Sequence, residues 1–193
     1  MSWTISTWDE ATGRGSVTSD IGELAFDSTV VEEGRFFDGF YPGDNVHVTL
    51  SKSATGYVVT SLKQGYRTDL EIARTLAGGA TLTVLPQQEG ILPVKMRGAA
   101  GVRWMLFFDP LHVDVPATLS AVTRFEWRGW DEIEDEEPGL AERWGVDPAE
   151  VGGEIASFYD AAGASLGHVL FANSFMLWRR SDPPPGISDS DQP

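Results

Sequence analysis

The chain has 193 residues, 41% of them hydrophobic, so it can bury a sizeable core in one large or two small domains. It has no cysteine, which excludes disulfides, thiolate metal sites and thiol catalysis and fits the reducing cytoplasm. Its 14 basic and 29 acidic residues give a net charge of −15, which disfavours nucleic-acid phosphates and favours basic partners, although acidic surfaces also simply keep proteins soluble. No signal peptide pattern or membrane-length apolar run occurs, so we expect a soluble cytoplasmic protein.

The first third of the chain has the pattern of a small closed β-barrel. Five β-type runs are separated by turn signals at a spacing of about 8–12 residues, which is typical of such barrels. In the fourth run, Val46, Val48 and Leu50 alternate with polar residues, so these three side chains are predicted to face the core. The five runs are residues 3–8, 14–18, 23–27, 45–51 and 57–62.

At these residues the segment resembles the cold-shock domain, a five-stranded OB-type barrel that binds single-stranded nucleic acid. The resemblance covers about a third of the chain and implies an OB-type fold for residues 1–64. The matching features are the spacing from Trp8 to Gly13-x-Gly15, the run Leu24-Ala25-Phe26-Asp27-Ser28, the strand start Gly43-Asp44-x-Val46 and the closing Val59-Thr60-Ser61-Leu62.

The sequence departs from this family at the positions that bind nucleic acid. The family stacks bases on aromatic residues of its second and third strands, where it has Lys-Gly-Phe-Gly-Phe and Val-Phe-Val-His-Phe. Here Arg14 and Ser16 replace both phenylalanines of the first motif, while Ala25, Asp27 and Ser28 replace the Phe, His and Phe of the second. Each stacked base contributes about 1–3 kcal/mol, so these losses remove most of the usual affinity.

Two groups of residues remain as candidates for binding a ligand or partner. Arg14 can stack on a base or pair with a carboxylate, and Trp8 is either a surface contact or part of the barrel rim. Four aromatic residues between residues 32 and 42 plug the barrel mouth, pack against the second domain or form a protein-binding patch, and we favour one of the first two. Phe26 is expected to point inward. The candidate contacts are Trp8, Arg14, Ser16, Phe36, Phe37, Phe40 and Tyr41.

A linker helix and an antiparallel meander follow the barrel segment. Thr68 and Glu71 have the spacing of a capping box and Gly78-Gly79 ends the pattern, so we place a linker helix at residues 65–79. Turn signals then separate four further β-type runs, which predicts an antiparallel sheet. These runs are residues 80–85, 91–97, 102–108 and 117–127.

Five cations in this meander form a candidate anion-binding face, because alternation places several of them on the same side of their strands. They are Lys95, Arg97, Arg103, Arg124 and Arg128. Residues 131–137 directly afterwards contain six carboxylates. We interpret this run as a solvated loop, with the sharper alternative that it folds over the cationic face as an internal mimic of phosphate.

The last third is predicted to contain one good helix, one strand and a tail. Asp147 is a suitable N-cap, Pro148 suits the first helical position, and apolar residues recur at helical spacing as far as Gly163. Residues 168–178 are apolar enough for a buried strand. Residues 182–193, rich in Pro, Ser and Asp, are predicted to be a disordered tail.

No catalytic motif stands out. His47, His112 and His168 lie in different β-type runs without metal-ligand spacing, and no phosphate-binding glycine loop or Gly-x-Ser-x-Gly elbow occurs. His112 and Asp114 share a strand face, which orients an imidazole in some enzymes but is more often a solvent-facing pair. We therefore expect no cofactor and no metal.

The predicted fold is β-rich and two-part: a cold-shock-like OB barrel at residues 1–64, the linker helix, and an α+β domain at residues 80–181 with an antiparallel sheet and one covering helix. The preferred function is a non-enzymatic, acidic protein-interaction or inhibitor-type module that binds a basic protein. The alternatives are a weak single-stranded RNA- or DNA-binding protein and an enzyme that uses the C-terminal domain.

Overall fold

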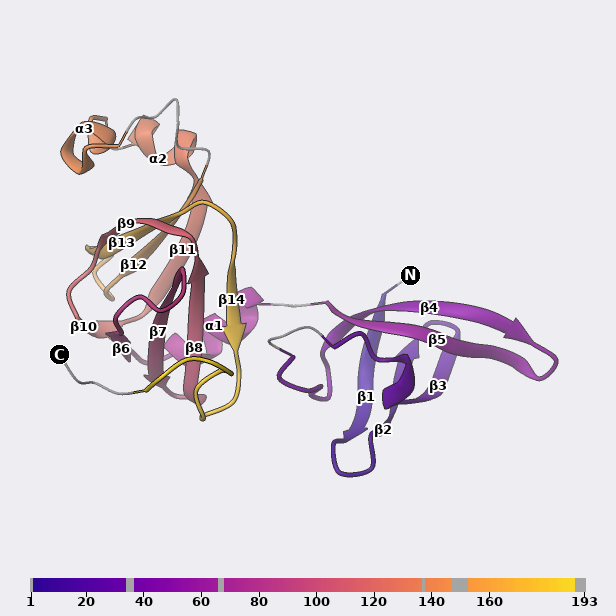
Figure 1. The fold of residues 1–193 in the computed structure, drawn as a ribbon. Helices are drawn as coiled ribbons and strands as arrows, with labels where there is room; N and C mark the ends of the chain where they lie inside the picture. Colours follow the sequence, from indigo (N-terminus) through magenta and orange to yellow (C-terminus); the bar gives the residue numbers. More distant parts are fainter. Residues whose placement is uncertain (1, 34–36, 66–67, 137, 147–152, 190–193) are drawn as a thin grey trace. The chain divides into compact units, whose positions relative to one another are not determined.

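The protein is β-rich, with antiparallel sheets and three short α-helices in the part of the chain that the structure describes. The computed structural model describes residues 2–33, 37–65, 68–136, 138–146 and 153–189. The chain divides into two compact units, Met1–Arg67 and Thr68–Pro193. Figure 1 shows the strands of each unit.

The first unit is built on one five-stranded sheet with the strand order β3-β2-β1-β4-β5. Its strands coincide with the five runs expected from the sequence, and the short 3-10 helix η1 (Ser28–Val30) follows β3. The strands are β1 (Trp3–Asp9), β2 (Arg14–Ser19), β3 (Gly22–Asp27), β4 (Asn45–Ser53) and β5 (Gly56–Gly65).

The sheet of the first unit does not close into a barrel, contrary to the closed barrel expected from the sequence. β3 and β5 are its two edge strands, and they approach each other without a shared hydrogen-bonded ladder in the described residues. Val31, just after η1, forms an isolated parallel bridge with Leu62 of β5. The sequence pattern predicts strands and faces, whereas closure depends on how far the edges of the finished sheet are apart.

The core of this unit lies on one face of the sheet, where alternate side chains of the strands meet. Val17 and Leu62 are fully buried, and Ile5 is 2% exposed. The buried cluster consists of Trp3, Ile5, Val17, Phe26, Phe40, Val46, Val59 and Leu62.

In its described residues, the second unit contains two antiparallel sheets and three α-helices. One sheet has the order β10-β6-β7-β8-β14 and the other the order β11-β12-β13-β9. The first sheet is formed by β6 (Ala80–Val84), β7 (Ile91–Gly98), β8 (Gly101–Phe108), β10 (Thr118–Val122) and β14 (Phe175–Trp178). The second is formed by β9 (Pro110–Asp114), β11 (Arg124–Gly129), β12 (Glu154–Tyr159) and β13 (Ser165–Phe171).

The main core of this unit contains apolar residues of both sheets, such as Met105 and Phe107 from one and Phe158 and Val169 from the other. Ile72 and Leu76 of α1 (Thr68–Leu76), which lies within the predicted linker helix, join the same core.

A second cluster lies on the other face of the β11-β12-β13-β9 sheet. Ile155 and Leu170 point there, because they alternate with Ala156 and Val169 of the main core. The helices α2 (Trp130–Glu136) and α3 (Leu140–Trp144) cover them with the side chains of Trp130, Ile133, Leu140, Ala141 and Trp144.

The helix predicted over residues 147–163 is wrong where the structure describes it, since Glu154–Tyr159 is the strand β12. Both faces of β12 are covered, so Ile155 to Tyr159 are all buried, and Ile155, Phe158 and Tyr159 fit a helical period equally well. The pairing of β12 with both β11 and β13 decides between the two structures. Residues 147–152 lie outside the described part.

Two other predicted runs each contain strands of both sheets. The run 117–127 breaks between β10 and β11, next to Ala121, whose φ of 56° is unusual for a residue with a side chain. The run 168–178 contains the end of β13 and all of β14, which also lie in different sheets. Chain reversals between the sheets therefore replace the simple meander expected after β8.

Residues 182–189 of the predicted disordered tail are ordered against the β10-β6-β7-β8-β14 sheet. Ile187 is 7% exposed, and the Gln88 side chain donates to the Ser188 carbonyl at 3.2 Å and accepts from its N–H at 2.9 Å. Lys95 of β7 donates to Asp189 at 2.7 Å. These contacts favour a tail that lies on the sheet over the one expected from the sequence, while residues 190–193 lie outside the described residues.

Candidate functional site

A β-bulge in β1 decides where Trp8 points. Ile5 pairs with Val17 and Thr7 pairs with Ser16, so Ser6 is the extra residue between them. The bulge turns Thr7 outward and Trp8 inward, opposite Gly15. A side chain at Gly15 would lie 2.5 Å from the Thr7 carbonyl oxygen and 2.8 Å from the Phe26 ring, so only glycine fits there.

Trp8 therefore forms part of an internal aromatic cluster and not a surface platform. Its ring stacks on Phe26 with centroids 5.5 Å apart and an angle of 7°, and Phe40 packs edge-on against both. Phe37 contacts Phe40 at 5.0 Å. The inward prediction for Phe26 is confirmed, and Phe37 and Phe40 plug the core, whereas Tyr41 remains 40% exposed. Phe36 lies outside the described residues.

The outward face of β2 and β3 is polar. The Ser16 hydroxyl lies 2.8 Å from the Thr7 hydroxyl and donates to Glu23 at 2.6 Å. Arg14 is exposed and lies opposite Asp27 in the ladder between the two strands. None of the outward residues of these two strands is aromatic, so no base-stacking platform replaces the lost phenylalanines.

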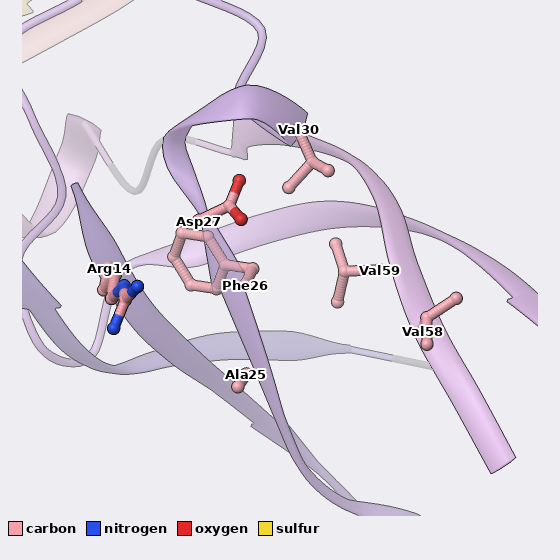
Figure 2. Close-up of a pocket in the computed structure, with 7 residues that line it drawn as sticks. All are labelled: Arg14, Ala25, Phe26, Asp27, Val30, Val58 and Val59. Carbon is pink, nitrogen blue, oxygen red and sulfur yellow. The ribbon is translucent and has the colours of Figure 1, made fainter. Parts of the chain in front are cut away.

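A pocket of about 400 Å³ lies between the two edge strands β3 and β5. We call it the seam pocket. Apolar side chains from both strands and from η1 line it, together with one cation and one carboxylate. Figure 2 shows the Val30 and Val59 side chains from one side and the Phe26 ring from the other around this space. The residues that line it are Arg14, Ala25, Phe26, Asp27, Val30, Val58 and Val59.

Hydrogen bonds and charge hold Asp27 ionised at the rim. The Thr29 hydroxyl and the Thr29 backbone N–H both donate to the Asp27 carboxylate, which caps η1, and Arg14 adds a favourable charge interaction. Together these contacts lower the pKa of Asp27 below its ordinary value. The rim therefore carries two opposite charges, of which Asp27 is held in place by its hydrogen bonds to Thr29.

Exposed apolar side chains extend the pocket along β5. Tyr57 is 53% exposed and Val58 is 45% exposed, although Val59 beside them is buried in the core. Neighbouring apolar residues with this exposure on an edge strand are what a partner chain can cover.

The five cations predicted to form an anion-binding face do not share one. Lys95 and Arg97 point away from the main core of the second unit, because they alternate with Val94 and Met96. Arg103 pairs with Met96 and so lies on the opposite face of that sheet. Arg124 and Arg128 belong to β11, in the other sheet.

The acidic run also has a different position from the one proposed for a phosphate mimic. It forms α2, whose Trp130 and Ile133 pack on the β11-β12-β13-β9 sheet, away from Lys95. The partner of Lys95 is Asp189, and Arg124 pairs with Glu126 at 3.0 Å and lies over the Tyr159 ring at 4.2 Å.

The sequence did not point to Val30, Val58 and Val59 as site residues. These valines fit the general pattern of a strand. A half-buried strand alternates apolar and polar residues, so the two adjacent apolar residues Tyr57 and Val58 were the only available signal. Among the predicted contacts that the structure describes, Arg14 alone lines the seam pocket.

The comparisons with known proteins add no relative: no family model, no curated protein and no solved structure matches this chain. Among the described residues, no helix is long and apolar enough to cross a membrane. The same residues contain no group of three or more His, Asp or Glu side chains placed to hold a metal ion.

Proposed function

We propose that the first unit is a protein-interaction module that binds an apolar side chain of a basic partner in the seam pocket. The pocket itself is the observation that carries this proposal, because apolar side chains and two opposite charges line it together at an exposed sheet edge. Its volume of about 400 Å³ lies in the usual range for ligand sites, roughly 300–1,000 Å³.

Charge supports a basic partner. The whole chain carries −15, and the polar face beside the pocket presents the exposed carboxylates Asp9, Glu23 and Asp27. At the rim, Asp27 offers a partner a carboxylate acceptor, and Arg14 offers the N–H donors of its guanidinium. Together these two groups fix the partner's orientation. A cytoplasmic setting belongs to the same proposal, since the chain has no cysteine.

In this proposal the cold-shock resemblance concerns the arrangement of the strands and not the ligand that the sheet binds. The strand order β3-β2-β1-β4-β5, with the two edges facing each other, supports an OB-type arrangement that has been left open. Single-stranded nucleic acid is the less favoured ligand, because Trp8 is partly buried against the core and the outer face is polar and acidic.

The test is selection of binders from a random-peptide phage library on the full-length protein, followed by affinity measurement of the enriched peptides by fluorescence anisotropy. We expect enriched peptides that combine an apolar anchor with Lys or Arg and that bind more weakly as salt rises. Val58→Asp places a charge in the pocket and is expected to weaken their binding by about tenfold or more.

Val113→Asp is the matched control, because Val113 is also a strand valine, 39% exposed, but in the second unit. Peptides that bind both variants and the wild type equally would overturn the proposal. The same instrument tests labelled single-stranded DNA and RNA at low and moderate salt. Binding that is lost in Arg14→Ala would overturn the protein-partner proposal in favour of nucleic acid.

A further inference from the structure

A buried histidine in the second unit links two serine hydroxyls. His168 is only 7% exposed. Its Nδ1 lies 2.9 Å from Ser157 Oγ, and its Nε2 lies 3.0 Å from Ser165 Oγ. Ser157 is 1% exposed, whereas Ser165 is exposed to solvent. An imidazole held at both nitrogens therefore connects the interior of the protein to one accessible hydroxyl.

The strand register builds this group. Ser157 of β12 lies directly opposite His168 of β13, and both point away from the main core, towards the face that α2 and α3 cover. In a regular strand, residues 165 and 168 would point to opposite faces. A bulge at Leu166 restores Ser165 to the side of His168, and bulges of this kind often re-aim a side chain next to an active site.

Glycine makes the bulge fit. Gly167 has a φ of 150°, and a side chain there would lie 2.5 Å from Val115 Cγ1 and 2.6 Å from the Asp114 carbonyl oxygen. The neighbouring strand therefore fixes the backbone between Ser165 and His168. Two rings shield the imidazole on the side of the helices. The Trp144 ring lies 5.8 Å from the His168 ring, and the His112 ring stacks on Trp144 at 4.6 Å.

We propose that Ser165 and His168 form an acyl-transfer site that hydrolyses carboxylic esters, with Ser157 as the positioning residue. This goes beyond the binding function proposed for the first unit. In the tautomer that donates the Nδ1 proton to Ser157 Oγ, Nε2 carries no proton and accepts the Ser165 proton, which is the arrangement of an activated nucleophile.

The reaction balances with water as the only co-substrate. Ser165 Oγ forms a bond to the carbonyl carbon of the ester as its proton passes to His168 Nε2, and the imidazolium then gives this proton to the departing alkoxide. A water molecule next attacks the acyl-serine and transfers a proton to Nε2. That proton returns to Ser165 Oγ as the carboxylic acid leaves.

Charged and titratable groups surround the imidazole on its own face of the sheet. Asp114 lies opposite His168 in one ladder, and Glu126 lies opposite Ser157 in the next, so a carboxylate lies on each side of the pair. Other groups on the described adjoining elements are His112 on β9, Arg124 and Arg128 on β11, Tyr159 on β12, the exposed Asp131, Glu132 and Asp135 on α2, and the exposed Glu142 and Arg143 on α3.

The first test is covalent labelling of the full-length protein with a fluorophosphonate, with the modified residue located by mass spectrometry. The Ser165 oxygen displaces fluoride from phosphorus and its proton goes to His168. We expect an adduct at Ser165 that is lost in Ser165→Ala and forms about 100-fold more slowly in His168→Gln. Ser120→Ala is the matched control, since Ser120 is an exposed strand serine of the same unit.

Absence of an adduct at Ser165, or labelling there no faster than at Ser120, would overturn the proposal. Hydrolysis of p-nitrophenyl acetate gives a second measurement on the same variants, and circular dichroism identifies any variant that does not fold. If His168→Gln does not fold, the pH dependence of wild-type labelling decides: it rises with deprotonation of an imidazole if the proposal is correct and is flat if it is not.

Ser157→Ala tests the positioning role. Without the Ser157 oxygen the imidazolium loses the acceptor of its Nδ1 proton, so the midpoint of the labelling profile is expected to move to lower pH as the rate falls. A role of Ser157 in packing alone predicts a change in the midpoint of unfolding with the labelling profile unmoved, and that result would remove Ser157 from the proposal.

Discussion

The two units use their sheets differently. In the first unit a single sheet buries one face, so β4 alternates between buried and exposed side chains and the outer face is polar. In the second unit β8 and β12 have both faces covered, so consecutive residues such as Met105 and Leu106 are fully buried. The difference shows that a strand is easy to recognise in the sequence when one of its faces is exposed to solvent. A strand with both faces buried is hard to recognise, because its residues do not alternate between apolar and polar.

The comparison also shows where each unit leaves polar or apolar groups available. The seam pocket lies where two edge strands of the first unit meet without a ladder, and Ser165 lies where a bulge interrupts a ladder in the second. In both cases the candidate site arises at a break in regular pairing, because a complete ladder covered on both faces leaves no group free to act.

The largest expected effect is in the core shared by the two sheets of the second unit. Phe158 is fully buried in β12, so Phe158→Ala is expected to lower the free energy of unfolding by about 3–5 kcal/mol through lost packing and the cavity left behind. Chemical denaturation followed by circular dichroism measures it. Val113→Ala, at a 39% exposed strand position, is the control, and equal losses for the two variants would contradict the two-sheet core.

A smaller effect is expected where the first unit requires glycine. Gly15→Ala forces a methyl group against the Thr7 carbonyl and the Phe26 ring, which is expected to cost about 1–3 kcal/mol in unfolding free energy. Gly129→Ala meets no atom within 4 Å and serves as the control. If thermal unfolding midpoints of both variants match the wild type, Trp8 and Phe26 do not stack over Gly15 as described.

The ordered tail is expected to contribute less. Lys95→Ala removes the ion pair with Asp189, a partly exposed contact worth about 0.2–1 kcal/mol. Hydrogen exchange at the Ser188 N–H, which donates to Gln88, is therefore expected to become faster by a few fold. Exchange that is already unprotected in the wild type would show that the tail does not lie against this sheet in solution.

The smallest expected effect concerns Asp27 at the rim of the seam pocket. Its pKa is lowered from 3.8 in the folded protein, so its ionised form adds stability above the unfolded pKa, and this contribution is lost as pH falls through the lower folded value. The stability difference between wild type and Asp27→Asn is thus expected to be largest at neutral pH and to vanish in acid.

Urea unfolding at a series of pH values measures this difference. Arg14→Ala is the informative companion, because the Thr29 hydroxyl is the main cause of the shift and Arg14 a lesser one, so this variant is expected to keep most of the pH dependence. A difference that persists unchanged into acid would show that Asp27 acts by geometry and not by charge.

The sequence by itself determined the strands of the first unit and the inward position of Phe26. Alternation and turn residues act within a few residues, so they are visible without knowledge of the rest of the chain. It also showed that the base-stacking aromatic residues are missing, because Arg14, Ser16 and Ala25 occupy positions where the cold-shock family has phenylalanine.

Only the tertiary structure decided the inward turn of Trp8, the strand at β12 and the two candidate sites. A single extra residue, Ser6, reverses the face of Trp8, and the pairing of β12 with two neighbours overrides a helical period. The seam pocket and the Ser157–His168–Ser165 group join residues of different strands, so they depend on edge spacing and cross-strand register. These quantities are set by the whole sheet and are not contained in any local stretch of sequence.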